Sequence, residues 1–110
     1  MQIIKRRVGD YSTLWKMKIR IRNPQTDKWE DDDLSDVDSA KLTMRRADGH
    51  AIFSDSACTV DVTNALVSYQ PSAGDVQVAG LFTLELRLKR SGRPQFLPSD
   101  DSDQFYVRLW

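Results

Sequence analysis

The sequence predicts an all-β protein built as an antiparallel sandwich. In residues 82–89 apolar and polar side chains alternate without a break, and residues 15–22 repeat that alternation. Because successive side chains of a strand point to opposite faces of its sheet, one face of each run can be buried while the other stays in water. Turn signals recur about every ten residues, which is typical of an immunoglobulin-like sandwich of about seven to nine strands. A barrel is the alternative, because strand counts do not separate the two architectures.

The N-terminal third is expected to hold two strands and then a loop. A short strand over residues 2–8 stops at a Gly-Asp turn, and a long ribbon follows over residues 11–22. The face of this ribbon that we expect to be buried carries Trp15, Met17, Ile19 and Ile21. The opposite face is basic and carries Lys16, Lys18, Arg20 and Arg22. Proline at position 24 cannot donate to a sheet ladder, so the ribbon ends there and the polar residues 25–39 are predicted to be a loop.

Turn residues separate the remaining strands. Asp48-Gly49 joins a strand over residues 41–46 to a returning arm over residues 51–53, and this dipeptide favours a tight hairpin because glycine accepts positive φ. Pro94 indicates that its strand lies at a sheet edge. The later strands are predicted over residues 58–62, 66–69, 82–89, 93–97 and 105–110. With a length of 110 residues, the chain is expected to fold as a single domain, 1–110.

Charge is balanced over the whole chain, but the two signs are separated along it. There are 16 basic and 16 acidic residues in all, so no global field draws nucleic acid or an anionic membrane. Residues 1–22 nevertheless carry seven basic side chains and one acidic one, whereas residues 23–39 carry seven acidic and one basic. Apolar runs are only a few residues long, which predicts no membrane span and no signal peptide. The lone Cys58 can form no internal disulfide, as expected of a protein made and folded in a cytoplasm.

The inventory of reactive side chains predicts neither an enzyme nor a cofactor site. His50 is the single histidine and follows the Asp48-Gly49 turn, where we expect it to be solvated. Cys58 begins a predicted strand and is interpreted as a small core residue. The sequence contains neither a phosphate-binding glycine loop nor zinc-ligand spacing.

Two acidic clusters raise the alternative of a calcium site, since hard carboxylate oxygens suit that ion. The clusters are Asp31, Asp32, Asp33, Asp36 and Asp38, and Asp100, Asp101 and Asp103. Their spacing lacks the glycine-centred loop of an EF-hand, so solvated loops without a metal are the preferred interpretation. A calcium-dependent or carbohydrate-binding module is the weaker alternative.

Interaction surfaces are the remaining candidates for function. The basic face of residues 16–22 can track a phosphate backbone, but it carries no exposed aromatic side chain for base stacking, so we prefer other functions to nucleic-acid binding. Aromatic residues outside the buried stripes are candidates for subunit contacts, because such residues are enriched at interface centres. These candidates are Trp29, Tyr106 and Trp110. The alternative for the same residues is that they cover the end of the sandwich.

Several short motifs resemble, in this order, those of small phage and prophage tail proteins. They are Arg7-Val8-Gly9-Asp10, Lys41-Leu42-Thr43-Met44-Arg45-Arg46-Ala47-Asp48-Gly49, Leu66-Val67-Ser68-Tyr69, Gly74-Asp75, Ala79-Gly80-Leu81-Phe82-Thr83-Leu84-Glu85-Leu86 and Phe96-Leu97-Pro98-Ser99. The chain is similar over nearly its whole length to the immunoglobulin-like N-terminal domain of baseplate upper proteins. The resemblance implies a non-catalytic structural component of a virion tail, baseplate or tail attachment. Its implied partners are other virion tail proteins and further copies of itself, in the host cytoplasm during assembly and then in the virion.

Two departures from that family stand out. Its members usually have a tyrosine where this chain has Phe82, and the tyrosine hydroxyl can bond back to the main chain. Phe82 lacks the hydroxyl, which implies either a lost hydrogen bond of about 1 kcal/mol or an anchor elsewhere. Baseplate upper proteins also continue into receptor-binding segments, whereas this chain stops at Trp110. A separate small tail or neck component is therefore an alternative to a baseplate position.

Overall fold

This computed structural model describes residues 1–99 and 102–110. In those residues the chain forms ten strands and one short 3₁₀ helix, η1 (Ala73–Val76). The predicted all-β fold is confirmed. Within the described residues, no helix has the length and apolar character needed to cross a membrane. The strands are β1 (Gln2–Arg6), β2 (Trp15–Lys18), β3 (Arg20–Asn23), β4 (Lys28–Asp31), β5 (Val37–Arg45), β6 (Ala51–Asp61), β7 (Leu66–Tyr69), β8 (Gly80–Arg90), β9 (Arg93–Leu97) and β10 (Phe105–Leu109).

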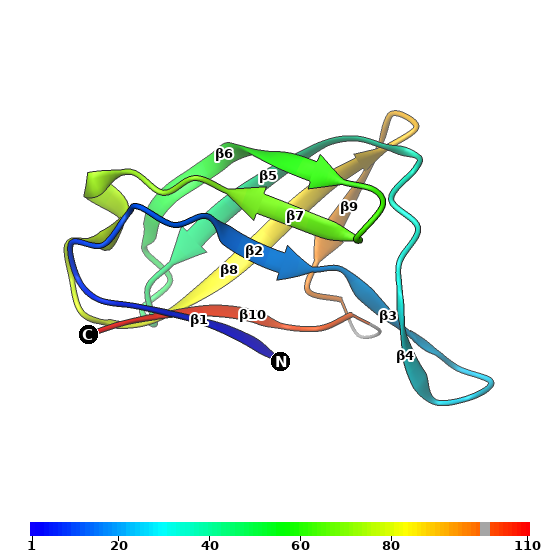
Figure 1. Cartoon of the computed structure of the whole chain (residues 1–110), viewed down its shortest axis with the longest axis horizontal. Helices are drawn as coiled ribbons and strands as arrows, with labels where there is room; N and C mark the ends of the chain where they lie inside the picture. Colours follow the sequence, from blue (N-terminus) through cyan, green and yellow to red (C-terminus); the bar gives the residue numbers. More distant parts are fainter. Residues whose placement is uncertain (100–101) are drawn as a thin grey trace.

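The main sheet folds over on itself to make the two layers of the sandwich. Its strands follow the order β1-β10-β8-β5-β6-β7-β2, and β9 pairs with the C-terminal half of β8. β6 belongs to both layers, because its first part pairs with β5 and its last residues pair with β7. The short layer of β2 and β7 consequently lies across β5, β8 and β10 (Figure 1). The main-sheet pairings are antiparallel except that of β1 with β10, which is parallel.

The two alternating runs supply opposite walls of the core, as predicted. On β8 the inward side chains are at most 4% exposed, and they are Phe82, Leu84, Leu86 and Leu88. On β2 both Trp15 and Met17 are fully buried. Each such side chain contributes about 1.5–3 kcal/mol by leaving water, so the two layers are held together mainly by this apolar contact.

The long ribbon predicted over residues 11–22 is wrong at both ends: residues 11–14 are in no strand, and the inward alternation ends at Ile19. Ile19 is the last inward residue, and its N–H donates to the carbonyl of Ala65 at 2.8 Å. The chain then leaves the sandwich, and β3 pairs with β4 in a separate two-stranded hairpin. Ile21, predicted to be buried, is 39% exposed for this reason. The predicted loop over residues 25–39 is also wrong in part, because it contains β4 and the start of β5.

The turns are confirmed in position, with two differences in detail. β5 and β6 form the predicted hairpin, and Gly49 has the positive φ, +90°, that its sequence indicated. The connection spans residues 46–50 and is longer than a two-residue turn. The two separate strands predicted over residues 51–53 and 58–62 belong to one strand, β6, which bulges at Asp55 with φ +54°. β9 pairs with β8 on one side only, which confirms the edge position that Pro94 indicated.

A buried tyrosine anchor is present, but on β7. The Tyr69 hydroxyl donates to Oδ2 of Asp75, in η1, at 2.6 Å, and the Ser72 N–H donates to the same oxygen at 2.9 Å. Burial raises the pKa of Tyr69, and the hydrogen bond to the Asp75 carboxylate raises it further. This pair ties the β7–β8 connection to the core and supplies an anchor that Phe82 cannot make.

Candidate interaction surfaces

The β3–β4 hairpin, residues 20–31, projects from one end of the sandwich and is called the arm below (Figure 1). All four residues of β4 are exposed, so this strand contributes nothing to the core. The arm is fixed at its base, where Arg20 Nη2 lies 2.5 Å from Oδ2 of Asp103, and Ile21 forms a bridge to Ser102. These contacts hold an otherwise solvent-exposed segment in one direction.

Asp103 is the buried end of this attachment, with 3% of its side chain exposed. Its carboxylate accepts hydrogen bonds from the N-terminal ammonium, from Arg20 and, at 3.0 Å, from Gln2 Nε2. Burial alone raises the pKa of Asp103, but the bonds from the ammonium, Arg20 and Gln2 outweigh burial and hold the pKa below its usual range. At neutral pH the Asp103 carboxylate therefore stays charged and keeps its ion pair with Arg20 at the base of the arm.

The three aromatic residues proposed as interface candidates do not form one surface. Trp29 lies on the arm, 45% exposed, with the Arg20 guanidinium 6.0 Å from its ring centroid. Trp110 is 52% exposed and lies at the opposite end of the long axis (Figure 1). Tyr106 is half-buried on β10, and its hydroxyl donates to Gln104 Oε1 at 2.5 Å. Trp29 and Trp110 are thus two separate exposed aromatic sites.

The basic face of residues 16–22 is largely neutralised by carboxylates. Lys18 Nζ lies 3.0 Å from Asp31, and Arg20 is held by Asp103 as described. A third pair joins Arg22 Nε to Asp27 at 3.3 Å. Lys16 is exposed, with no carboxylate within ion-pair distance among residues 1–99 and 102–110. Cations that already pair with carboxylates contribute little to the binding of a phosphate backbone.

The acidic segment after the arm is occupied by ion pairs. Arg90, at the end of β8, lies 2.6 Å from Asp32 and 2.6 Å from Asp36, and its own side chain is only 18% exposed. Asp38 accepts the Gly92 N–H at 3.2 Å. In the described residues, no three carboxylate, imidazole or thiol side chains come together in a way that could hold a metal ion. Asp100 and Asp101, of the second acidic cluster, lie outside those residues.

Neither of the two candidate reactive residues lies in a catalytic arrangement. His50 is 82% exposed beside the hairpin turn, with Nδ1 3.7 Å from Asp48. Cys58 is half-buried, and burial raises its thiol pKa to about 12. A thiol with that pKa stays protonated at neutral pH and is a poor nucleophile.

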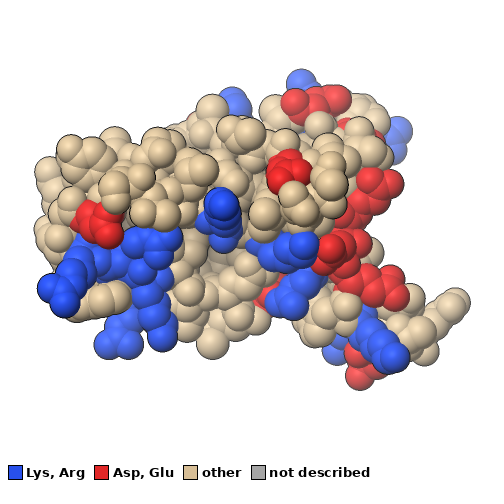
Figure 2. Space-filling model, in the orientation of Figure 1, with Lys and Arg blue, Asp and Glu red and all other residues tan. Residues whose placement is uncertain are grey.

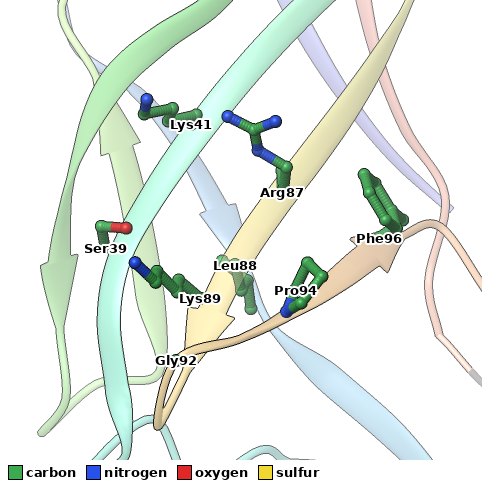
Figure 3. Close-up of a pocket in the computed structure, with 8 residues that line it drawn as sticks. All are labelled: Ser39, Lys41, Arg87, Leu88, Lys89, Gly92, Pro94 and Phe96. Carbon is green, nitrogen blue, oxygen red and sulfur yellow. The ribbon is translucent and has the colours of Figure 1, made fainter.

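A basic hollow on the outer face of the main sheet was not predicted. It encloses about 390 Å³ and is lined by residues of β5, β8 and β9 (Figure 3). Arg87 lies between Lys41 and Phe96 in this view, and Phe96 is 65% exposed. Arg87 has a carboxylate partner, Asp55, at 3.5 Å. The alternation of each strand places these side chains outward, but only the pairing of β5, β8 and β9 brings them together.

In comparisons with known proteins, no family model and no curated sequence matches this chain.

Proposed function

We propose that this protein is a non-catalytic structural component of a phage or prophage virion, in the tail, baseplate or a tail attachment. It acts by packing against other virion proteins after folding in the host cytoplasm. The observation that carries the proposal is the arm: a hairpin whose second strand gives nothing to the core, which is attached at its base by an ion pair and a β-bridge and presents Trp29 to solvent. Beyond its base, a segment of this kind adds no apolar contact to its own domain, and its exposed aromatic side chain suits a contact with another molecule.

The sequence motifs set out above support the same role, because they resemble those of phage tail proteins. The fold suits it as well, since a sandwich leaves edge strands and loops available for neighbouring subunits. The DNA-binding alternative through residues 16–22 gains no support, because three of the four cations on that face already have carboxylate partners.

Particles purified from a host that produces this chain provide the test. We expect mass spectrometry to find the chain in the particles, and deletion of its gene to give defective tails. Trp29→Ala should lower incorporation into particles, whereas Leu81→Ala, which truncates another side chain, 54% exposed, should leave it unchanged. Absence of the chain from intact particles, or normal tails without the gene, would contradict the proposal.

A further inference from the structure

Acidic and basic side chains gather at opposite ends of the folded molecule. Figure 2 shows Asp and Glu side chains over the segment between β4 and β5, beside the arm, and Lys and Arg side chains over β1 at the other end. The separation noted along the sequence is kept in space in part: Arg20 and Arg22 of the basic segment lie on the arm, where they pair with Asp103 and Asp27. One molecule cannot bring these two ends together, so their attraction is available only to another molecule.

The basic end contains a shallow groove of about 580 Å³ between β1 and β2. Two apolar residues in its lining, Ile3 and Leu14, are 40% and 39% exposed. Three cations also line the groove: Lys5, Arg6 and Lys16. Arg6 donates to main-chain carbonyls, those of Lys5 at 2.8 Å and Leu14 at 3.4 Å. Over residues 1–99 and 102–110, none of the three cations lies within ion-pair distance of a carboxylate.

Both strands that border the groove have a free edge. In residues 1–99 and 102–110, β1 pairs with no strand but β10, and β2 with no strand but β7. The β2 edge is capped in part, because the Gln2 side chain accepts from the Lys18 N–H at 2.9 Å and donates to the Lys18 carbonyl at 2.7 Å. A free edge presents unpaired N–H and carbonyl groups to a neighbouring chain unless something covers it. The groove therefore combines positive charge with exposed apolar surface, beside strand edges that the Gln2 and Arg6 side chains cover in part.

The acidic end has complementary properties. In the described part of the chain, three of its carboxylates lack a cation within ion-pair distance: Glu30, Asp33 and Asp38. The arm beside them carries exposed Trp29 and Ile21, and Ile21 lies directly across from Glu30 in the hairpin. A surface with both carboxylates and apolar side chains matches a groove with both cations and apolar side chains.

We propose that copies of this chain associate head to tail, with the arm and acidic segment of one copy seated in the β1–β2 groove of the next. The contact is heterologous, since two different surfaces meet, and such contacts build rings when the rotation closes and filaments when it does not. The inference rests on the assembly role proposed above and names a second copy as one partner. Its test uses purified protein alone, so it can fail while incorporation into particles stands.

Two variants each remove one half of the contact without touching the core. The groove variant is Lys5→Glu with Lys16→Glu, and the arm variant is Trp29→Ala with Glu30→Gln; all four side chains are exposed. Sedimentation velocity over a wide range of protein concentration should show wild-type species larger than a dimer in about 0.1 M salt, weakened in about 1 M salt, where charges are screened beyond about 3 Å. Each variant alone should associate at least about tenfold more weakly.

An equimolar mixture of the two variants is the decisive measurement. Each variant keeps one working surface, so the mixture should form one-to-one dimers that grow no further. The matched control, Lys41→Glu with Lys89→Glu, makes the same charge change as the groove variant in the hollow of Figure 3 and should leave association unchanged. The proposal is overturned by a wild-type monomer at every concentration, by variants that still associate like wild type, by a monomeric mixture, or by loss of association in the control.

Discussion

Replacing Tyr69 by phenylalanine removes one hydroxyl from the core, and the structure sets the size of the effect. The hydroxyl donates to the Asp75 carboxylate at 2.6 Å, and both residues are buried, at 7% and 8% exposed. A hydrogen bond to a charged group is worth about 1.5–3 kcal/mol. Asp75 keeps its bond from the Ser72 N–H, so the carboxylate is not left without a donor. We therefore expect Tyr69→Phe to lower the free energy of unfolding by about 2 kcal/mol.

Packing changes little in this variant, which isolates the hydroxyl. The Tyr69 ring stacks on Phe53 with centroids 4.8 Å apart and lies 5.6 Å from Trp15, and phenylalanine keeps both contacts. Urea unfolding measures the loss, and a thermal melt should shift down by about 8 °C. Tyr106→Phe is the matched control, because its hydroxyl is bonded to an exposed side chain, and it should cost less than about 0.5 kcal/mol. Equal losses in the two variants would refute the reasoning.

The same hydroxyl makes the protein sensitive to base. Burial, with the Asp75 hydrogen bond, raises the pKa of Tyr69 in the folded state above its unfolded value of about 10. A raised pKa means that this group's contribution to stability is complete below pH about 10 and is lost as the pH rises through the folded value. The stability difference between wild type and Tyr69→Phe should therefore shrink above pH about 10. A constant difference across that range would show that the hydroxyl is not the group responsible.

Three shorter predictions test other parts of the structure. Asp103→Ala should lower the free energy of unfolding by about 2 kcal/mol at neutral pH, because Arg20 loses its carboxylate partner. The folded pKa of Asp103 is depressed, so the stability difference between wild type and the variant should shrink as the pH falls below about 4. Urea unfolding of both proteins at a series of pH values measures this difference. Cys58 should react with a thiol reagent at least about tenfold more slowly in native protein than in urea, because burial raises its pKa to about 12. Gly49→Ala should cost about 1 kcal/mol in unfolding free energy because its φ is +90°, whereas Gly74→Ala, with open space and no such φ, should cost less.

Alternation predicted the strands wherever a strand has one face in the core. The inward residues of β8 and of β2 alternate with polar residues because each contacts the opposite layer. The arm gave no such signal, since neither face of β4 is buried and nothing selects apolar residues at every second position. Ile21 continued the ribbon's alternation although the chain had already left the sandwich after Ile19. Residue patterns record burial, so they cannot report strands that pair without burial.

The candidate surfaces were less predictable than the strands, because their members come together only through pairing. Trp29 was identified from its type and its polar surroundings, and its exposure on the arm agrees with that choice. The hollow around Arg87 and Phe96 needed the register of β8 with β9, in which these two residues are opposite each other. Strand register depends on contacts across the sheet, which one strand's sequence does not contain.

The distribution of ion pairs supports the head-to-tail contact that we propose for this neutral chain. Most carboxylates of the acidic segment form ion pairs within the molecule. Arg90 pairs with both Asp32 and Asp36 and so fixes that segment to the end of β8. These pairs cancel charge locally and add no long-range field. In the described residues, the charges without an ion-pair partner include Glu30, Asp33 and Asp38 at the end that carries the arm, and the three cations that line the β1–β2 groove. These two sets of charges cannot meet within one molecule, and a second copy carries a surface complementary to each of them.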